Sequence, residues 1–171
     1  MKKLIFPLVL GALTLALSGC AGYSLGGHKP GHLAGITKLA VPTFENLTLE
    51  PRLGALLTNA VIKQLQVDGA YQIVSKENAE AVLEGRVSGI DRSQFRSDRN
   101  NVLRTSQLLM RLHADFVVRD PNSSAPIHTG RANANSYIVL DANVQNSEAQ
   151  ALEDAAQRLA ATIANDLSEG W

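Results

Sequence analysis

The sequence predicts an α+β fold in which two helices pack on one face of a mainly antiparallel sheet of about four strands. Three observations predict it. Two segments carry apolar residues at helical spacing, several segments alternate apolar with polar residues, and clusters of turn-forming residues separate the strands. Because each helix and strand has one apolar side to bury, we expect a two-layer sandwich whose second sheet face is polar and open.

The first strand and the first helix are predicted from the start of this domain. Residues 36–41 form a short apolar run and residues 43–50 are predicted as a loop. Pro51 suits the first turn of a helix, where its missing N–H is not needed. Apolar residues then recur at helical spacing, namely Leu53, Leu56, Leu57, Ala60, Val61 and Leu65. Asp68-Gly69 is typical of a helix end, since glycine adopts the left-handed stop readily.

Further strands follow this helix. They are predicted at residues 71–74, 81–95, 107–119 and 128–140. The segments 97–101 and 120–124 are rich in Asp, Asn and Ser, which favour turns. The long strands therefore form a meander, which supplies the antiparallel part of the sheet.

A second helix closes the chain. Ser147-Glu148-Ala149-Gln150 has the pattern of a capping box, which predicts that the helix begins there. Its apolar stripe comprises Leu152, Ala156, Leu159, Ile163 and Leu167.

The first twenty residues have the order of a bacterial lipoprotein signal. Lys2 and Lys3 precede an apolar run that ends at Leu17 and is shorter than the roughly 20 residues of a membrane span. Leu17-Ser18-Gly19-Cys20 resembles the lipobox of bacterial lipoproteins, in which cleavage between Gly19 and Cys20 leaves an N-palmitoyl, S-diacylglyceryl cysteine.

Cys20 is the single cysteine of the sequence, so it forms no internal disulfide. An ordinary secreted protein with a cysteine near its cleavage point is the alternative interpretation. By the same resemblance, Ala21 favours the outer membrane, because it is not the aspartate associated with retention in the inner membrane of enterobacteria. We expect residues 1–19 to be the signal peptide, 20–35 a lipidated flexible tether, and 36–171 a single domain on the periplasmic side.

Positive charge is concentrated in the middle of the chain. Eight of the ten arginines lie between Arg86 and Arg131, a span with four aspartates and no lysine, so this block carries about +4. The mature chain as a whole is near −2, which gives no case for nucleic acid. The uneven distribution suggests an anionic partner, and a solvated sheet face is the alternative.

The sequence offers no arrangement typical of an enzyme. The histidines are scattered, at His28, His32, His113 and His128. The cysteine is used by lipid, and neither a phosphate-binding glycine loop nor a nucleophile elbow is present in the sequence. We therefore predict no catalysis, no cofactor and no metal.

Two stretches resemble a known family. Residues 20–27, Cys-Ala-Gly-Tyr-Ser-Leu-Gly-Gly, resemble the C-G-Y-x-L opening of LptE-type lipopolysaccharide-assembly lipoproteins. Residues 36–46, followed by Leu49-Glu50-Pro51 and Leu57-Thr58, resemble the first strand, loop and helix of that family. Asp68-Gly69 with Ile73-Val74, followed by residues 81–85, resemble its next strands.

The resemblance implies a function. LptE proteins are outer-membrane lipoproteins that sit largely inside the LptD β-barrel, plug it, assist its assembly and bind lipopolysaccharide during its delivery to the outer leaflet. An accessory lipoprotein of another envelope secretion or polysaccharide-export complex is the alternative. In either case the partners are envelope components.

The arginines of the middle block are the candidate contacts. In continuous strands, most of them have the parity opposite to the apolar residues, and they therefore project from the open sheet face. Guanidinium groups favour bidentate contact with phosphate and carboxylate. The candidates for contacting lipopolysaccharide or the barrel are Arg86, Arg92, Arg96, Arg99, Arg104, Arg111 and Arg131.

Overall fold

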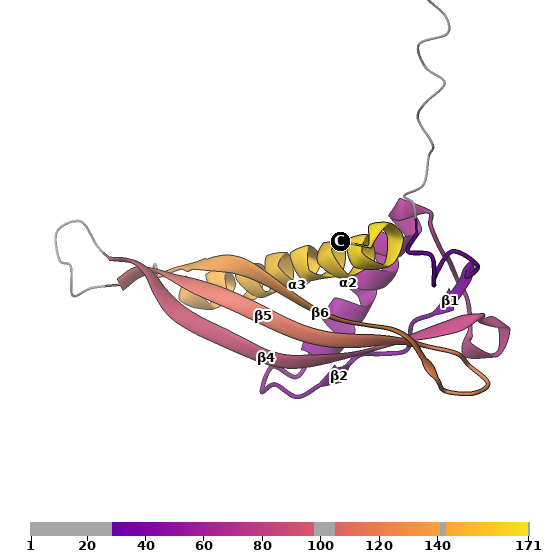
Figure 1. The fold of residues 1–171 in the computed structure, drawn as a ribbon. Coiled ribbons are helices and arrows are strands. Elements are labelled where there is room, and N and C mark those ends of the chain that lie inside the picture. Colours follow the sequence, from indigo (N-terminus) through magenta and orange to yellow (C-terminus); the bar gives the residue numbers. More distant parts are fainter. Residues whose placement is uncertain (1–28, 98–104, 141–142, 171) are drawn as a thin grey trace, which may run out of the picture.

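The computed structural model describes residues 29–97, 105–140 and 143–170, which form two layers (Figure 1). The elements are β1 (Lys38–Ala40), β2 (Glu45–Asn46), α2 (Leu53–Asp68), β3 (Gln72–Ile73), a 3-10 turn η2 (Lys76–Asn78), β4 (Ala81–Ser97), β5 (Thr105–Arg119), β6 (Pro126–Val139) and α3 (Val144–Glu169). Both α-helices lie on the same side of the sheet, so the predicted α+β class is confirmed. No helix in these ranges is both long and apolar enough to span a bilayer.

The sheet has six strands rather than about four, and it is mixed rather than mainly antiparallel. Its order is β3-β1-β4-β5-β6, with β2 also paired to β4. β4, β5 and β6 form the predicted antiparallel meander. The pairs β1·β3, β1·β4 and β2·β4 are parallel. The chain leaves β1, crosses the sheet through α2 and returns beside β1, and such a crossover produces parallel strands.

The core lies between the helices and the sheet. α2 contributes a fully buried stripe that comprises Leu53, Leu57, Val61 and Leu65. From α3, the predicted Ala156, Leu159, Ile163 and Leu167 are buried, and Leu152 is half-buried. Additional alanines on α3 let this long helix lie close to the strands. Burying one leucine stabilises the fold by about 1.5–3 kcal/mol, so these two stripes account for much of the packing.

Two glycines in the sheet provide space for aromatic rings. A Cβ atom at Gly85 would lie 2.2 Å from the ring of Phe44, and one at Gly130 would lie 2.2 Å from the ring of Phe116. Gly85, Phe116 and Gly130 stand in one cross-strand row. Phe116 therefore rests directly on the backbone of the next strand.

The final helix begins earlier than the sequence predicts. Val144 is its first residue, and the carbonyl of Asn143 accepts hydrogen bonds from the N–H groups of Asn146 and Ser147. The capping box that we expected at Ser147 is therefore not the start of the helix. Its Glu148 side chain instead binds an arginine of β4.

Several sequence predictions lie outside the described residues. These are the signal peptide, the cleavage point between Gly19 and Cys20, and the arginines Arg99 and Arg104. Of the predicted tether, residues 29–35 are described. They form a turn whose Leu33 is 1% exposed and belongs to the core.

Candidate functional site: the helix-free face of the sheet

The sheet face that turns away from α2 and α3 is termed the helix-free face here. On β5 and β6 it carries alternate residues, whose neighbours point into the core. Its β6 residues are all exposed, namely Thr129, Arg131, Asn133, Asn135, Tyr137 and Val139. The predicted open polar face therefore exists.

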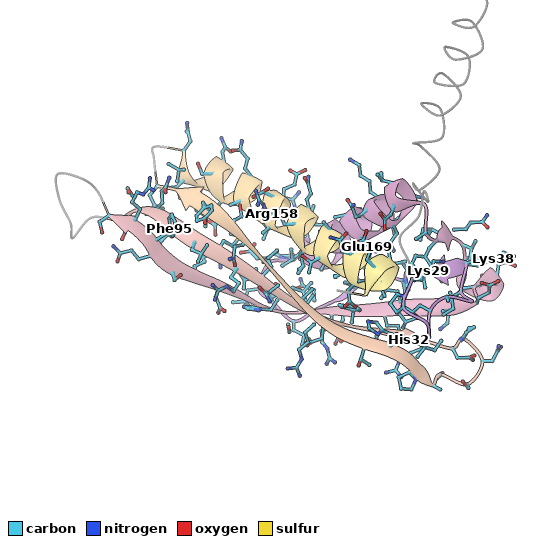
Figure 2. All side chains as sticks on the ribbon, turned by 45° about the horizontal axis from the view of Figure 1, so that its top comes forward. Lys29, His32, Lys38, Phe95, Arg158 and Glu169 are labelled. Atoms are coloured by element: carbon cyan, nitrogen blue, oxygen red, sulfur yellow. The ribbon has the colours of Figure 1, made fainter. Side chains whose placement is uncertain are left out.

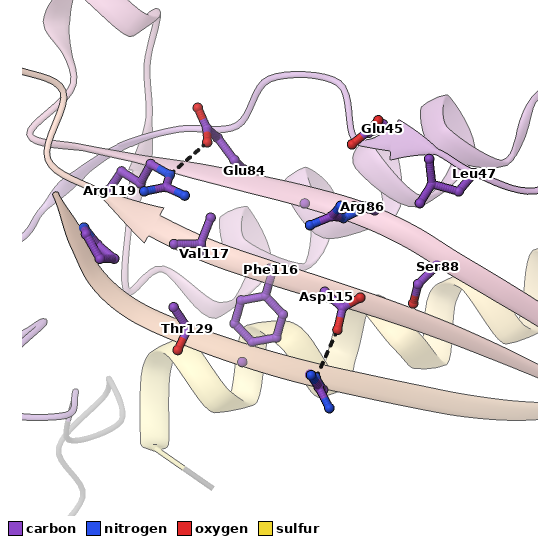
Figure 3. A pocket seen from close by; sticks show the side chains of 14 residues that line it. Glu45, Leu47, Glu84, Arg86, Ser88, Asp115, Phe116, Val117, Arg119 and Thr129 are labelled. Carbon is purple, nitrogen blue, oxygen red and sulfur yellow. Dashed lines mark hydrogen bonds and ion pairs between the residues drawn. The ribbon is translucent and has the colours of Figure 1, made fainter. Parts of the chain in front are cut away.

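One row of charges crosses four strands on this face. Paired strands bring together Glu45 of β2, Arg86 of β4, Asp115 of β5 and Arg131 of β6. The signs alternate along this row. Arg131 Nε lies 3.1 Å from Asp115 Oδ1, and a neighbouring pair joins Arg119 Nε to Glu84 Oε2, also at 3.1 Å (Figure 3). These side chains border a shallow open groove of about 890 Å³.

Further along the strands, charge is again balanced. Asp91 stands opposite Arg111 in the ladder. Asp91 Oδ2 lies 2.9 Å from His113 Nε2, and Arg111 Nε donates a hydrogen bond of 3.0 Å to Asn135 Oδ1. On this part of the face four arginines of the middle block alternate with four acidic residues, and two of these arginines, Arg119 and Arg131, form ion pairs there.

The end of the helix-free face near the β4–β5 connection is different, because it combines aromatic rings with an arginine. The rings of Phe95 and Tyr137 are 4.6 Å apart between centroids, and they are 48% and 51% exposed. The guanidinium of Arg96 lies 5.9 Å from the Phe95 ring centroid. Leu109 is the cross-strand neighbour of Tyr137. We term these four residues the aromatic–arginine cluster, and Figure 2 shows Phe95 at this end of the sheet.

Arg92 contradicts the prediction that it lies on the open face. The β4–β5 register shifts between Val87 and Gly89, where Ser88 is the extra residue of a bulge. Beyond it the parity of β4 is reversed as far as Gln94, and Arg92 pairs with the buried Met110. A second register shift between Gln94 and Arg96 restores the parity, so that Arg96 pairs with Gln107 of the helix-free face. The Arg92 side chain therefore lies on the helix side of the sheet.

On that side Arg92 joins two acidic residues from different elements. Its Nη2 lies 2.7 Å from Glu148 of α3 and 2.9 Å from Glu50 of the loop before α2. Partial burial alone would lower the pKa of Arg92, but the hydrogen bonds to Glu148 and Glu50 outweigh it and raise this pKa above its ordinary value. Arg92 thus links β4 to α3 and to the loop before α2.

The other candidate arginines that the structure describes differ in the residues that they contact. Arg131 has Asp115, and Arg111 has Asn135 with Asp91 opposite. Within the described parts of the chain, three candidates make no ion pair with an acidic residue, and because Arg111 is hydrogen-bonded to Asn135, the two that remain are Arg86 and Arg96. These two are therefore the candidates with free capacity for an anion.

Sequence reasoning missed the aromatic half of the cluster. Phe95 and Tyr137 lie 42 positions apart, on strands separated by β5, so no local pattern joins them. Of the described residues, no group of three or more His, Cys, Asp or Glu lies close enough together to hold a metal ion.

Comparison with known proteins identifies a family match. A family model described as lipopolysaccharide-assembly, LptE, matches residues 36–167. This range includes β1 to β6 and nearly all of α3. No curated protein sequence matches the chain.

Solved structures of bacterial proteins share the fold. PelC of Paraburkholderia phytofirmans, a dodecamer, is 17% identical with a TM-score of 0.55, and the match covers 83% of this chain and 94% of that one. A Caulobacter crescentus CB15 protein described as a lipoprotein is 22% identical with a TM-score of 0.50, over 73% and 87% of the two chains. A Xanthomonas campestris protein is 12% identical with a TM-score of 0.53, over 83% and 90%. At these identities the likeness concerns the fold alone.

Proposed function

The chain belongs to the LptE family of lipopolysaccharide-assembly proteins, and from this premise we propose that it is an outer-membrane lipoprotein that plugs and helps assemble an LptD-type β-barrel and binds lipopolysaccharide. The lipid is carried by Cys20, after cleavage behind Gly19. The anchor holds the domain at the periplasmic side of the outer membrane. Several acyl chains bind durably, because each buried methylene contributes about 0.8 kcal/mol.

The observation that carries the binding proposal is the aromatic–arginine cluster. Lipopolysaccharide offers anionic phosphates next to acyl chains. Arg96 supplies a cation without a described acidic partner, and the exposed rings of Phe95 and Tyr137 supply apolar surface beside it. Arg99 and Arg104, which flank the same connection in sequence, would add charge. This end of the helix-free face is therefore the proposed lipopolysaccharide site.

The alternating charges on the helix-free face support the other part of the proposal, which is contact with the barrel. The interior of a large outer-membrane barrel is polar. A face on which Arg86, Asp115 and Arg131 alternate in sign presents both donors and acceptors to such a wall. Because exposed ion pairs contribute only about 0.2–1 kcal/mol, these side chains can exchange partners at little cost.

Co-purification tests the partner. The full lipidated chain with an affinity tag, solubilised from outer membranes, is expected to bring down a large β-barrel protein in a stable complex. A variant with Cys20→Ser serves as the control for anchoring, since it retains the domain and loses the lipid. Recovery of a secretion or polysaccharide-export complex instead, or of no barrel at all, would contradict the proposal.

A further inference from the structure

The segment Lys29–Ile36, termed the strap, packs across one end of the domain. It is folded by two hydrogen bonds, from Leu33 N to the carbonyl of Pro30 at 2.7 Å and from Ile36 N to the carbonyl of Leu33 at 3.0 Å. The Leu33 side chain is 1% exposed. The strap is therefore anchored by one apolar side chain at its centre.

Polar contacts fix the start of the strap. Lys29 Nζ donates to the carbonyl of Ile36 at 2.6 Å and lies 4.1 Å from the ring centroid of Tyr71. The Tyr71 hydroxyl donates in turn to the carbonyl of Leu167 on α3 at 2.7 Å. The strap thus contacts the last turns of α3 through Tyr71.

Two histidines and an aspartate form a second connection. His32 Nε2 lies 3.0 Å from His128 Nδ1, and His128 Nε2 lies 2.6 Å from Asp166 Oδ2. These three residues, His32, His128 and Asp166, are termed the relay, and they come from the strap, β6 and α3. Figure 2 shows His32 at the end of the sheet opposite Phe95, so this relay is remote from the proposed lipopolysaccharide site.

The hydrogen bonds of the relay determine which of its nitrogen atoms carry protons. An ionised Asp166 only accepts hydrogen bonds, so His128 carries a proton on Nε2. When His128 is neutral its Nδ1 is an acceptor, and His32 must then donate from Nε2. A first additional proton on His32 preserves every bond, because an imidazolium still donates from Nε2. A second additional proton then has to occupy Nδ1 of His128. Two N–H groups and two positive charges would then face each other.

The charged groups around the relay lie on α3 and on the strap, and nearby Glu80 attracts Lys29 while Asp68 is bonded to Ser168 of α3. Asp166 is the one carboxylate bonded within the relay, and Glu169 lies one turn further along α3. Across the sheet the neighbour of His128 is Val118, and the Phe116 ring stands 6.0 Å from the imidazole. Lys29, the charged group of the strap, has the same sign as the added protons.

We infer that His32, His128 and Asp166 form a proton-dependent lock, which holds the strap on the domain at neutral pH and loosens it when the imidazole pair takes up its second proton. Histidine is the side chain whose charge ordinarily changes between about pH 5 and 8. The first proton leaves the strap docked and the second removes the His32–His128 bond.

Hydrogen exchange of the full chain tests this inference. The reporters are the amides of Leu33 and Ile36, corrected for the intrinsic pH dependence of exchange, with the Leu112 amide in β5 monitoring global folding. We expect constant protection of both strap amides from pH 7.5 to 6.5 and a loss of about tenfold by pH 4.5, the size expected for one hydrogen bond.

Three variants separate the lock from general acid effects. In His32→Gln the side-chain amide can donate to His128 Nδ1 or, after flipping, accept from it, so protection stays constant with pH. His32→Ala has reduced protection at every pH. His113→Gln, which alters a histidine paired with Asp91 on the helix-free face, behaves like the unmodified chain. An unchanged acid response in His32→Gln, full protection in His32→Ala, or a flat profile in the unmodified chain would each overturn the inference.

Discussion

Arg96 and its neighbours show how single residues set the chemistry of the helix-free face. Of the seven candidate arginines, the five that the structure describes have different partners. Arg92 is bound by Glu50 and Glu148, and Arg131 by Asp115. Arg96 instead lies beside an exposed aromatic ring. A guanidinium without an acidic partner among the described residues, beside an apolar ring, suits an anionic lipid, whereas the paired arginines suit a polar protein surface.

Charge reversal at this end of the sheet is therefore expected to weaken binding. Arg96→Glu combined with Arg99→Glu should raise the Kd for lipopolysaccharide about tenfold or more, since charged hydrogen bonds contribute about 1.5–3 kcal/mol each. The matched control combines Lys63→Glu with Lys76→Glu, which changes the charge equally at exposed positions on α2 and η2. Equal binding by the folded arginine variant and the control would reject Arg96 and Arg99 as contacts.

Gly130 is a second position where one residue decides the packing. Because a Cβ there would meet the Phe116 ring at 2.2 Å, Gly130→Ala should lower the free energy of unfolding by about 1–3 kcal/mol. Gly89→Ala is the control, since the nearest atom to its Cβ is His113 Cδ2 at 4.0 Å. Urea denaturation measures both variants. A similar small change in the free energy of unfolding of both variants would show that the Phe116 ring moves aside freely.

At the scale of the elements, the sequence predicts both helices and the three long strands, because each has a clear period. It does not predict β2, whose two residues are too few to show alternation. It also misplaces Arg92, since the bulge at Ser88 reverses the parity of β4 without a local sequence signal. Both features depend on strand pairing between residues that are distant in sequence. The local periodicity of the sequence does not show which strands pair.

The start of β1 depends on one carboxylate. Glu80 accepts hydrogen bonds from Thr37 N at 2.7 Å, Lys38 N at 3.0 Å and the Thr37 hydroxyl at 3.0 Å. The bond from the Thr37 backbone contributes most to holding the pKa of Glu80 below its usual value. A carboxylate with a lowered folded-state pKa stabilises the fold above its unfolded pKa and loses this contribution as the pH falls through the folded value.

Glu80→Gln is accordingly expected to lower the urea midpoint at pH 7, and the difference from the unmodified chain should shrink as the pH falls through the folded-state pKa of Glu80. Glu153→Gln, on the outer side of α3, serves as the control and should show little difference at either pH. If the Glu80→Gln difference persisted undiminished at pH 3, the carboxylate charge would not be its source.

The whole molecule is an elongated sandwich with distinct ends. Figure 2 places His32 and the strap at one end of the sheet and Phe95 at the other. The helix-free face runs between them, with balanced charge in the middle and the aromatic–arginine cluster at the far end. The chain belongs to the LptE family, and the uncovered sheet face is the surface that we propose for its partners.

The most direct test of the central claim is site-specific photo-crosslinking in cells. A photoreactive amino acid replaces Tyr137 in the aromatic–arginine cluster or, as the matched control, the exposed Gln157 on α3. A lipopolysaccharide adduct is expected from position 137 and none from position 157. Lipopolysaccharide adducts from position 157 but not from position 137 would contradict the assignment of the helix-free face as the binding surface.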